Sequence, residues 1–334
     1  MHARSVLITR DARFVAGGWD MARVLVAGAA GFLGSHLVDR LLAEGHQVLG
    51  VDNFITGAHR NVAHIENHPR FRFAEADVTK PYSPECPFGG GFERVYHLAS
   101  PASPVDYLRL PFETLFAGSD ATRVLLDIAW RDGARFLLAS TSEVYGDPSV
   151  HPQVETYWGN VNSIGPRAVY DEAKRYAEAL TMTYHRYRSV ETRIARIFNT
   201  YGPRMRTEDG RAVPAFCSQV LRGEPLTVFG DGSQTRSYCY VSDLIEGLYG
   251  LMESSLDLPC NLGNPYELTV SELAEVIMRA EGRVLELVRL PLPEDDPKQR
   301  RPDIARAHQT FGWEPKVGFD VGLRSTLDYF RSIV

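Results

Sequence analysis

The sequence is poor in lysine and cysteine and contains no long apolar run. Its four cysteines show no Cys-x-x-Cys spacing, so nothing suggests a zinc site or a disulfide framework, and a reducing cytoplasm is expected. No segment is long and apolar enough to span a bilayer. The net charge of -6 gives no reason to expect nucleic acid or an anionic membrane as a partner. Arginine is the default cation, because the 36 basic residues include only four lysines, namely Lys80, Lys174, Lys298 and Lys316.

Length and composition are ordinary for a soluble globular enzyme. The 334 residues, 44% of them hydrophobic and 23% charged, suffice for one large domain or two linked lobes. Three histidines, His59, His64 and His68, stand in a polar stretch that we interpret as a solvated helix face, so no metal site is expected. Residues 1–20 precede a second methionine, Met21, and lack the apolar core of a secretory signal. We expect them to be a disordered extension outside the fold.

Residues 21–52 have the layout of a dinucleotide-binding unit. A strand-like run leads into a turn with Gly28, Gly31 and Gly34, and an apolar-periodic helix and a second strand-like run follow, ending in Asp52. Gly28 permits the tight turn, Gly31 lets backbone N–H groups reach a pyrophosphate, and Gly34 lets helix and strand pack closely. Asp52 lies where a carboxylate accepts both ribose hydroxyls, which favours NAD over NADP.

Strand-like and helix-like segments continue to alternate after this unit. The alternation predicts an α/β fold, a Rossmann-type doubly wound parallel sheet that binds ligands at the carboxyl ends of its strands. Glycine and proline punctuate short elements beyond residue 198, which predicts a smaller C-terminal substrate-binding lobe. We assign 21–198 to the NAD-binding domain, to which later segments return, and 199–334 mainly to that lobe. Strands are predicted at 70–77, 94–100, 135–143 and 192–197, and helices at 122–131 and 170–187.

The glycine spacing, together with the Tyr-x-x-x-Lys pair of Tyr170 and Lys174, resembles the extended short-chain dehydrogenase/reductase family. A lysine kept at position 174, in a chain that otherwise uses arginine, indicates a role that needs a compact ammonium group. The resemblance implies that Tyr170 is the catalytic base. It also implies that Lys174 hydrogen-bonds ribose and lowers the pKa of the phenol.

Further motifs narrow the resemblance to the UDP-glucuronate decarboxylases, which make UDP-xylose. The chain carries Thr141-Ser142-Glu143 where nucleotide-sugar 4,6-dehydratases have an Asp-Glu pair and 4-epimerases usually lack the Glu. Two more segments fit, the SPASP run at 100–104 and the Arg-Arg-Pro-Asp run at 300–303. The resemblance covers nearly everything after the N-terminal extension. It implies oxidation at C4 by NAD, loss of carbon dioxide from the 4-keto acid, and re-reduction by the same NADH.

The resemblance also implies roles for individual residues. Thr141 hydrogen-bonds the C4 oxygen, while Glu143 and Arg300 act at the carboxylate end, orienting the ring and managing the proton that replaces carbon dioxide. The UDP-glucuronate contacts are Arg300, Asn199 and two diphosphate clamps, Arg211 and Arg236. The NAD contacts, besides Tyr170 and Lys174, are Gly28, Gly31, Phe32, Leu33, Gly34, Asp52, Asn53, Phe54, Thr56, Gly57, Asp77, Val78, Leu98, Ser100, Thr200 and Arg211.

One segment departs from the decarboxylase pattern. Phe116-Ala117-Gly118 stands where these enzymes usually have a lysine followed by Thr-Asn, positions that help to bind the cofactor and the acid sugar. Three alternatives therefore stay open: a UDP-glucuronate 4-epimerase, a relative that stops at the 4-keto pentose, and a catalytically weakened binding homologue. Uridine or thymidine specificity also stays open. The family implies a homodimer formed through paired helices.

Overall fold

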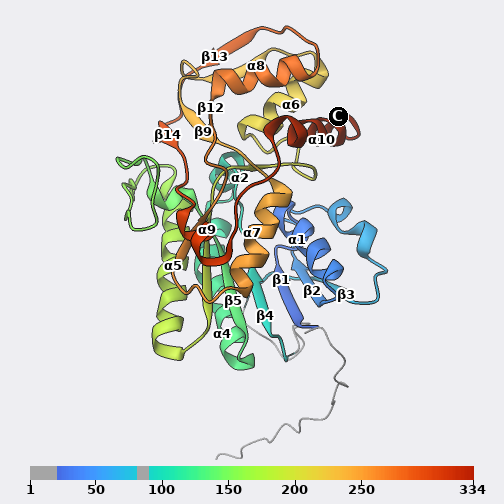
Figure 1. Ribbon diagram of the computed structural model, residues 1–334, viewed down its shortest axis with the longest axis vertical. Helices are drawn as coiled ribbons and strands as arrows, with labels where there is room; N and C mark the ends of the chain where they lie inside the picture. Colours follow the sequence, from blue (N-terminus) through green and yellow to red (C-terminus); the bar gives the residue numbers. More distant parts are fainter. Residues whose placement is uncertain (1–20, 81–89) are drawn as a thin grey trace, which may run out of the picture.

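The structure is a computed structural model and describes residues 21–80 and 90–334. Its centre is a seven-stranded parallel sheet in the order β11-β6-β5-β4-β1-β2-β3 (Figure 1). This confirms the predicted Rossmann-type doubly wound fold. The prediction for residues 1–20 lies outside the described residues. The strands are β1 (Arg23–Ala27), β2 (Gln47–Asp52), β3 (Phe71–Glu75), β4 (Arg94–His97), β5 (Arg135–Thr141), β6 (Thr192–Ile197) and β11 (Pro259–Leu262).

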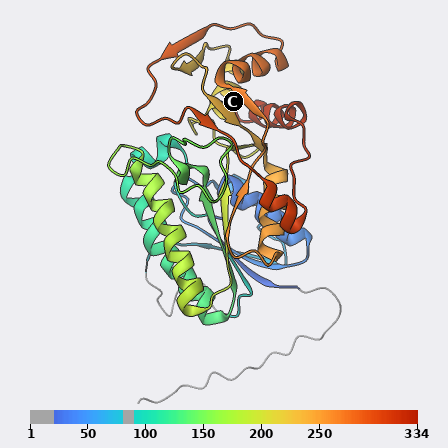
Figure 2. The ribbon, with the colours of Figure 1, turned by 60° about the vertical axis from the view of Figure 1, so that its left-hand side comes forward.

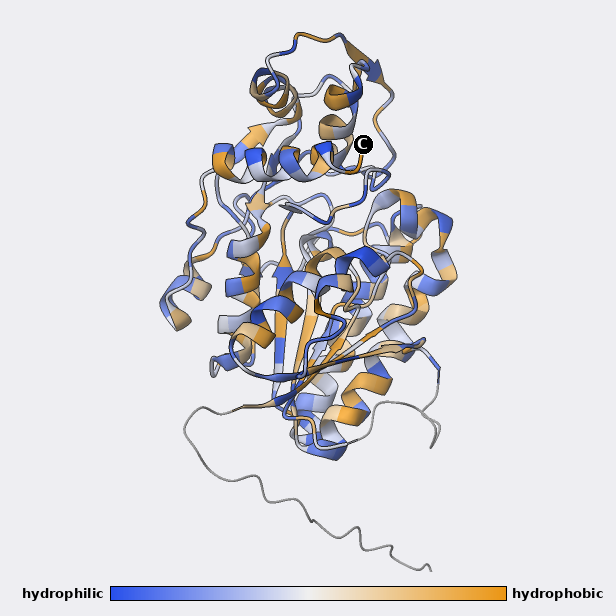
Figure 3. Ribbon diagram, turned by 90° about the vertical axis from the view of Figure 1, so that its right-hand side faces the viewer, coloured by the Kyte–Doolittle hydropathy of each residue, from blue (hydrophilic) through white to orange (hydrophobic). Residues whose placement is uncertain are grey.

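Helices cover both faces of this sheet. Leu37 of α1 (Phe32–Ala43) and Leu248 of α7 (Val241–Glu253) belong to one core cluster. The other face is covered by α4 (Thr122–Asp132) and α5 (Ala168–Arg188), which lie side by side in Figure 2 and contribute Leu125 and Ala177 to a second cluster. Because both faces are covered, the central strands are rich in hydrophobic residues, which are orange in Figure 3. The last four residues of β1 are all buried.

A smaller lobe lies above the sheet in Figure 1 and has its own core, which includes Phe216, Leu273 and Leu327. In this lobe β8 pairs with β13, and β9 lies between β12 and β14. Its elements are α6 (Ala212–Arg222), β8 (Leu226–Phe229), β9 (Thr235–Ser237), β12 (Glu267–Thr269), α8 (Val270–Ala280), β13 (Leu287–Leu290), β14 (Gln299–Arg300) and α10 (Phe319–Arg331).

The chain passes between the two parts more than once. After β6 it enters the smaller lobe, returns with α7 and β11 to the sheet, and leaves again at β12. Short connecting elements line this passage, and several border the site described below. They are the 3-10 turns His59–Asn61, Ala63–Ile65 and Ser142–Tyr145, the helices α2 (Pro104–Arg109), α3 (Pro111–Phe116) and α9 (Ala305–Phe311), the π-helical turn Ala117–Ala121, and the paired strands β7 (Thr200–Tyr201) and β10 (Cys239–Tyr240).

Several local predictions differ from the structure. The strands expected at 70–77 and 94–100 end earlier, at Glu75 and His97. The strand expected at 135–143 ends at Thr141, because the Thr141 hydroxyl accepts a hydrogen bond from the backbone N–H of Glu143 at 3.3 Å and turns the chain into a 3-10 helix. The expected helix face around the three histidines consists of two 3-10 turns instead. In it, His59 stacks on Phe54 with ring centroids 3.6 Å apart.

Candidate active site

A cavity of about 860 Å³ lies between the carboxyl ends of the parallel strands and the smaller lobe. Its walls come from the segments that follow β1, β2, β4, β5 and β6, and from the smaller lobe. In an open α/β sheet this is the position where ligands bind, because the strand order reverses there and the loops splay apart. In this sheet β1 lies between β4 and β2, so the reversal falls at β1.

The glycine turn after β1 has the close approaches that the sequence predicted. Gly28 has φ +85°, and a Cβ there would lie 2.7 Å from the backbone nitrogen of Ala99. A Cβ on Gly34 would overlap the carbonyl oxygen of Gly28, so α1 packs directly on the turn. Gly31 is the N-cap of α1, and the helix therefore points its N-terminus at the cavity that Gly31 and Phe32 line. This cradle fits the pyrophosphate of a dinucleotide.

Asp52 and Asn61 line the neighbouring part of the cavity. The Asp52 carboxylate accepts hydrogen bonds from the backbone N–H groups of Ala30 at 3.0 Å and Phe54 at 2.8 Å, and burial raises its pKa despite these bonds. Each carboxylate oxygen keeps a lone pair for a ribose hydroxyl. Asn61 donates to the carbonyl of Ala30 at 2.9 Å, but its own side-chain oxygen is buried without a partner. The residues present therefore fit NAD at this end.

Most predicted contacts border this cavity, and three do not. Phe54 packs its ring on His59, Gly57 lies against the Asp52 carboxylate, and Arg300 is buried behind Glu143. The predicted residues that line the cavity are Gly28, Gly31, Phe32, Leu33, Gly34, Asp52, Asn53, Thr56, Asp77, Val78, Leu98, Ser100, Thr141, Glu143, Tyr170, Lys174, Asn199, Thr200, Arg211 and Arg236.

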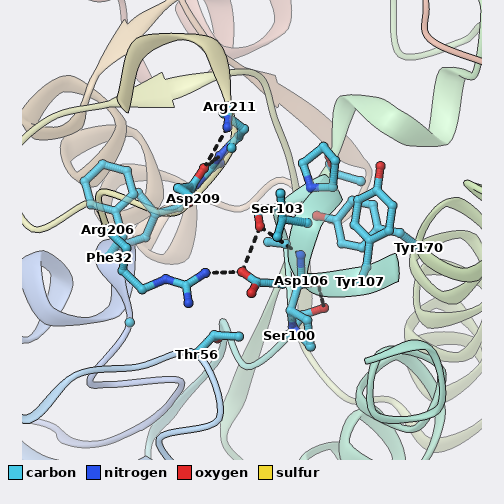
Figure 4. A pocket seen from close by; sticks show the side chains of 18 of the residues that line it. Phe32, Thr56, Ser100, Ser103, Asp106, Tyr107, Tyr170, Arg206, Asp209 and Arg211 are labelled. Carbon is cyan, nitrogen blue, oxygen red and sulfur yellow. Dashed lines mark hydrogen bonds and ion pairs between the residues drawn. The ribbon is translucent and has the colours of Figure 1, made fainter. Parts of the chain in front are cut away.

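Tyr170 and Lys174 lie on α5 beside the end of β5. The ring of Tyr170 is stacked on that of Tyr107, with centroids 5.1 Å apart and planes 8° from parallel (Figure 4). Burial raises the pKa of Tyr170 well above the ordinary value for a phenol, while a hydrogen bond with Thr141 and the charge of Arg211 act to lower it. Without a ligand the phenol is therefore protonated. When NAD is bound, its positive nicotinamide and the Lys174 ammonium would lower the pKa of the phenol toward neutral pH.

The Lys174 ammonium is held by the strand rather than by the phenol. Its Nζ donates to the carbonyl of Ala139 at 2.9 Å and lies 5.7 Å from the centroid of the Tyr170 ring. Burial lowers the pKa of Lys174 to about 8, and Glu178 acts against this decrease. Lys174 lines the cavity, and its hydrogen bond with a ribose hydroxyl stays a prediction.

Glu143 is fixed between two guanidinium groups. Arg167 donates to its Oε2 at 2.7 Å, and Arg300 Nη1 lies 3.1 Å from its Oε1. Arg300, which is 1% exposed, also donates to the Ser142 hydroxyl and to the carbonyl of Gly146, each at 2.9 Å. Burial alone would raise the pKa of Glu143, but Arg300 and Arg167 hold it well below its usual value. Glu143 is therefore a fixed carboxylate at neutral pH.

Arg167 continues into a second ion-pair chain. Its Nη1 is 3.6 Å from Asp296, which in turn accepts a hydrogen bond from Arg236 at 2.9 Å. Arg167, Arg236, Asp296 and Glu143 all line the cavity. With Arg300 behind Glu143, the network joins three guanidinium groups to two carboxylates. Buried Asp171 lies close enough to interact with Glu143, Arg167 and Arg300, and burial together with Glu143 raises its pKa to about 7.

The segment between β7 and α6 borders the cavity and is held to α1 and α2 by two arginine–aspartate pairs. Arg204 donates to Asp39 of α1 at 2.7 Å, and Arg206 pairs with Asp106 of α2 (Figure 4). Asp106 is buried and also accepts a hydrogen bond from the Ser103 hydroxyl at 2.7 Å. The same segment carries Arg211, whose guanidinium pairs with Asp209 through two contacts of 2.5 and 2.8 Å. We use the name clasp for residues 203–211.

The sequence did not single out Tyr107, Arg167, Asn61 or Asp296 as site residues. Each follows or precedes a motif that was recognised: Tyr107 lies just after the SPASP run, and Arg167 lies one helical turn before Tyr170. The short sequence separation between Arg167 and Tyr170 was the signal that could have identified Arg167 as a site residue. Nothing local in the sequence pairs Asp296 with Arg167.

The segment that departs from the decarboxylase pattern packs tightly. Phe116 lines the cavity and is 48% exposed, and the carbonyl of Ala117 contacts Nε2 of the buried His97 at 3.2 Å. A Cβ on Gly118 would lie 2.5 Å from the carbonyl oxygen of Ala173, so glycine is required for this π-helical turn to contact α5. Gly118 therefore allows this turn to pack closely on the helix that carries Lys174.

Among residues 21–80 and 90–334, no helix has the length and apolar character to cross a membrane. The same residues contain no group of three or more His, Cys, Asp or Glu side chains arranged to hold a metal ion. Cys217, Cys239 and Cys260 are buried free thiols.

Comparison with known proteins places these features in a family. Residues 24–263 match the model of the NAD dependent epimerase/dehydratase family. The chain is 55% identical to a UDP-glucuronic acid decarboxylase of Arabidopsis thaliana over 93% of its length and 69% of that protein, and 51% identical to one of Xenopus tropicalis over 93% and 73%. A crystal structure of UDP-glucuronic acid 4-epimerase from Bacillus cereus, with UDP-glucuronic acid and NAD, is 28% identical, with a TM-score of 0.82 over 93% of this chain and all of that one. The chain therefore belongs to the NAD-dependent epimerase/dehydratase family and, within it, to the UDP-glucuronic acid decarboxylases.

Proposed function

We propose that the protein converts UDP-glucuronate to UDP-xylose and carbon dioxide, with NAD oxidising C4 and returning the hydride in the same turnover. The observation that carries this proposal is Glu143, held as a carboxylate between Arg167 and Arg300 next to Tyr170. Its support comes from the relatives at 51 to 55% identity, whose names specify this decarboxylation. The solved 4-epimerase, at 28% identity, is a more distant match.

Tyr170 and Thr141 serve the C4 end of the sugar. The phenolate of Tyr170 accepts the proton of the 4-hydroxyl, and the Thr141 hydroxyl donates a hydrogen bond to the C4 oxygen as negative charge forms there. Burial of Tyr170 keeps water away from the proton in transit, and the stacked Tyr107 ring fixes the plane of the phenol. Oxidation at C4 makes the C5 carboxylate a β-keto acid, whose carbon–carbon bond then breaks to release carbon dioxide.

The guanidinium groups serve the carboxylate end. Arg167 and Arg300 both lie against Glu143 on this side of the cavity, and their positive charges favour binding of the substrate carboxylate there. Arg167 lines the cavity and can contact that carboxylate directly, whereas Arg300 acts through Glu143. As a fixed carboxylate, Glu143 orients a water or hydroxyl that carries the proton delivered to C5.

The smaller lobe supplies the nucleotide end. Arg211, Arg236 and Asn199 line the cavity, and guanidinium groups bind diphosphate oxygens in pairs. In the structure each arginine is paired with a carboxylate, Asp209 or Asp296, so diphosphate binding must compete with these internal partners. Whether the base is uridine or thymidine depends on contacts at this end of the cavity.

We further propose that the protein forms a homodimer through α5 and its neighbours. Tyr176, Leu180, Thr183 and Tyr187 occupy one stripe of α5 at helical spacing, and the tyrosines are 53% and 83% exposed. Phe112, 68% exposed, lies on the adjacent α3. Light scattering of the purified chain tests this, with Tyr187→Glu expected to shift the mass toward that of a monomer.

We propose a cytoplasmic location, supported by the three buried free thiols. Cell fractionation tests it, and recovery of the protein from an oxidising compartment would contradict it.

The activity is tested by incubating the protein with UDP-glucuronate and NAD and following the products by mass. We expect a UDP-sugar lighter by one carbon dioxide, with NAD needed only in catalytic amounts. Tyr170→Phe is the matched control, which keeps the cavity but removes the base. A product of unchanged mass would indicate a 4-epimerase, and accumulation of the 4-keto pentose with stoichiometric NADH would indicate an incomplete decarboxylase.

A further inference from the structure

A buried polar cluster of Ser140, Glu178 and Arg196 lies on the sheet side of α5, and of these three residues only Ser140 borders the cavity. Glu178 of α5 accepts a hydrogen bond from the Ser140 hydroxyl at 2.7 Å, and Arg196 donates to its two carboxylate oxygens at 2.9 and 2.8 Å. Ser140 and Arg196 are direct neighbours across the β5–β6 pair, so both side chains leave the sheet on the same face. Glu178 and Arg196 are both largely buried, with side chains 12% exposed. None of the catalytic steps above uses this cluster.

The cluster is held rigidly from several sides. Arg196 Nη1 also donates to the hydroxyl of Tyr145 and to the carbonyl of Glu155, each at 3.0 Å. The Tyr145 hydroxyl donates in turn to Asn261 of β11 at 2.7 Å. The guanidinium of Arg196 therefore spans β6, α5 and the 3-10 turn after β5, and it cannot move away from Glu178 without breaking four hydrogen bonds.

Glu178 stands one helical turn after Lys174, where side chains at i and i+4 are neighbours on the same face. Both residues are also tied to the same strand end, because Lys174 Nζ donates to the carbonyl of Ala139 and Ser140 donates to Glu178. Burial and Glu178 are the two influences on the pKa of Lys174, and they act in opposite directions. Burial favours the neutral amine, whereas the carboxylate favours the ammonium.

The other titratable groups around Lys174 do not replace this carboxylate. His97 of β4 is buried, and burial together with Lys174 lowers its pKa to about 3, so it is neutral. Tyr170 is protonated in the absence of a ligand. Arg196 of β6 is positive and therefore opposes protonation of Lys174 unless Glu178 neutralises it.

We propose that Glu178 is a positioning residue for Lys174, keeping the buried ammonium charged and fixing the strand end to which it is bonded, while Arg196 limits the strength of this effect. Only the role of Glu178 in catalysis rests on the proposed function. The charge that it assigns to Lys174 is a property of the folded chain. Arginine at position 174 could not play this part, because its pKa lies far above the range that the cluster controls.

The scarcity of lysine gives a direct test. Protein labelled with ¹³C at the lysine ε carbon contains four labelled lysines, and Lys80, Lys298 and Lys316 are exposed. In the NAD-loaded protein we expect the signal of Lys174 to titrate below the ordinary lysine value of about 10.4. Glu178→Gln should lower the Lys174 midpoint by on the order of one further pH unit.

A second variant separates this charge effect from a loss of structure. Arg196→Met removes the cation that partly neutralises Glu178, so the Lys174 midpoint should rise, opposite to the effect of Glu178→Gln. Glu172→Gln is the matched control, since Glu172 lies on the same helix but is half exposed and paired with Arg175 at 3.6 Å. It should leave the midpoint unchanged.

The same variants should move the alkaline limb of UDP-glucuronate turnover in the same directions as the lysine midpoint. An unchanged or raised midpoint in Glu178→Gln, or shifts of the same sign in Glu178→Gln and Arg196→Met, would overturn the proposal. If wild-type protein failed to decarboxylate UDP-glucuronate, the proposed function would fall, while the lysine titration would still decide whether Glu178 sets the charge of Lys174.

Discussion

Replacing Arg300 by methionine tests how much the site depends on a residue that does not border the cavity. The substitution keeps most of the side-chain volume but removes the donors to Ser142, Glu143 and Gly146. Breaking a buried ion pair by removing one partner costs about 3–5 kcal/mol. Because Arg167 still holds Glu143, we expect the lower end, about 3 kcal/mol of unfolding free energy. For a chain of this size this corresponds to a fall of about 1 M in the urea midpoint.

The stability difference between wild type and Arg300→Met should also change with pH in a defined direction. In the folded protein the pKa of Glu143 is held below its usual value of 4.5, so the stabilisation is complete above that pH and is lost as the pH falls through the folded pKa. Arg300→Met removes much of this shift, and the stability difference from wild type should narrow in acid. Arg301→Met is the control, because Arg301 is 42% exposed and 3.8 Å from Glu267, and it should cost less than about 0.5 kcal/mol. Equal effects of the two variants, or a difference that widens in acid, would refute the reasoning.

Three further changes test the cavity. Tyr170→Phe should lower turnover at least about 100-fold while NAD remains bound, because it removes only the phenol oxygen; retention of a tenth of the wild-type rate would show that another group is the base. Calorimetry should show that NAD binds at least about tenfold more tightly than NADP, because the 2′-phosphate of NADP would lie next to the Asp52 carboxylate. Asp52→Asn should reduce this ratio of affinities, and equal affinities of the wild-type protein for NAD and NADP would contradict the prediction. Arg206→Ala should speed NAD dissociation about fivefold or more, because it removes the pair that holds the clasp to buried Asp106. Arg109 also pairs with Asp106 but is exposed, so Arg109→Ala should leave the dissociation rate of NAD unchanged.

The sequence predicted the parts of the site that follow from local patterns. The glycine turn, Asp52 and the Tyr170–Lys174 pair each lie within one strand–turn–helix unit or one helix, where spacing alone determines the relative positions of side chains. Six of the seven strands of the sheet followed from the alternation of apolar segments, whereas β11 lies in the range assigned mainly to the smaller lobe and was not predicted.

The remaining parts depend on contacts between distant segments. Glu143 and Arg300 are 157 residues apart, and no local pattern shows that Arg300 is buried behind the carboxylate instead of facing the cavity. Gly118 looked like a lost binding residue in the sequence. Its close approach to Ala173 shows that it is required by packing between the π-helical turn and α5. Such pairings arise only when the fold brings the segments together.

The proposed reaction requires that the hydride removed from C4 stays in the site until carbon dioxide has left and then returns to the same carbon. This is tested most directly with UDP-glucuronate carrying deuterium at C4, turned over in ordinary water and examined by mass spectrometry and NMR. We expect UDP-xylose that retains deuterium at C4, carries a new hydrogen from solvent at C5, and forms with one carbon dioxide per sugar. Loss of the deuterium to solvent, or a UDP-sugar that keeps its carboxylate, would contradict it.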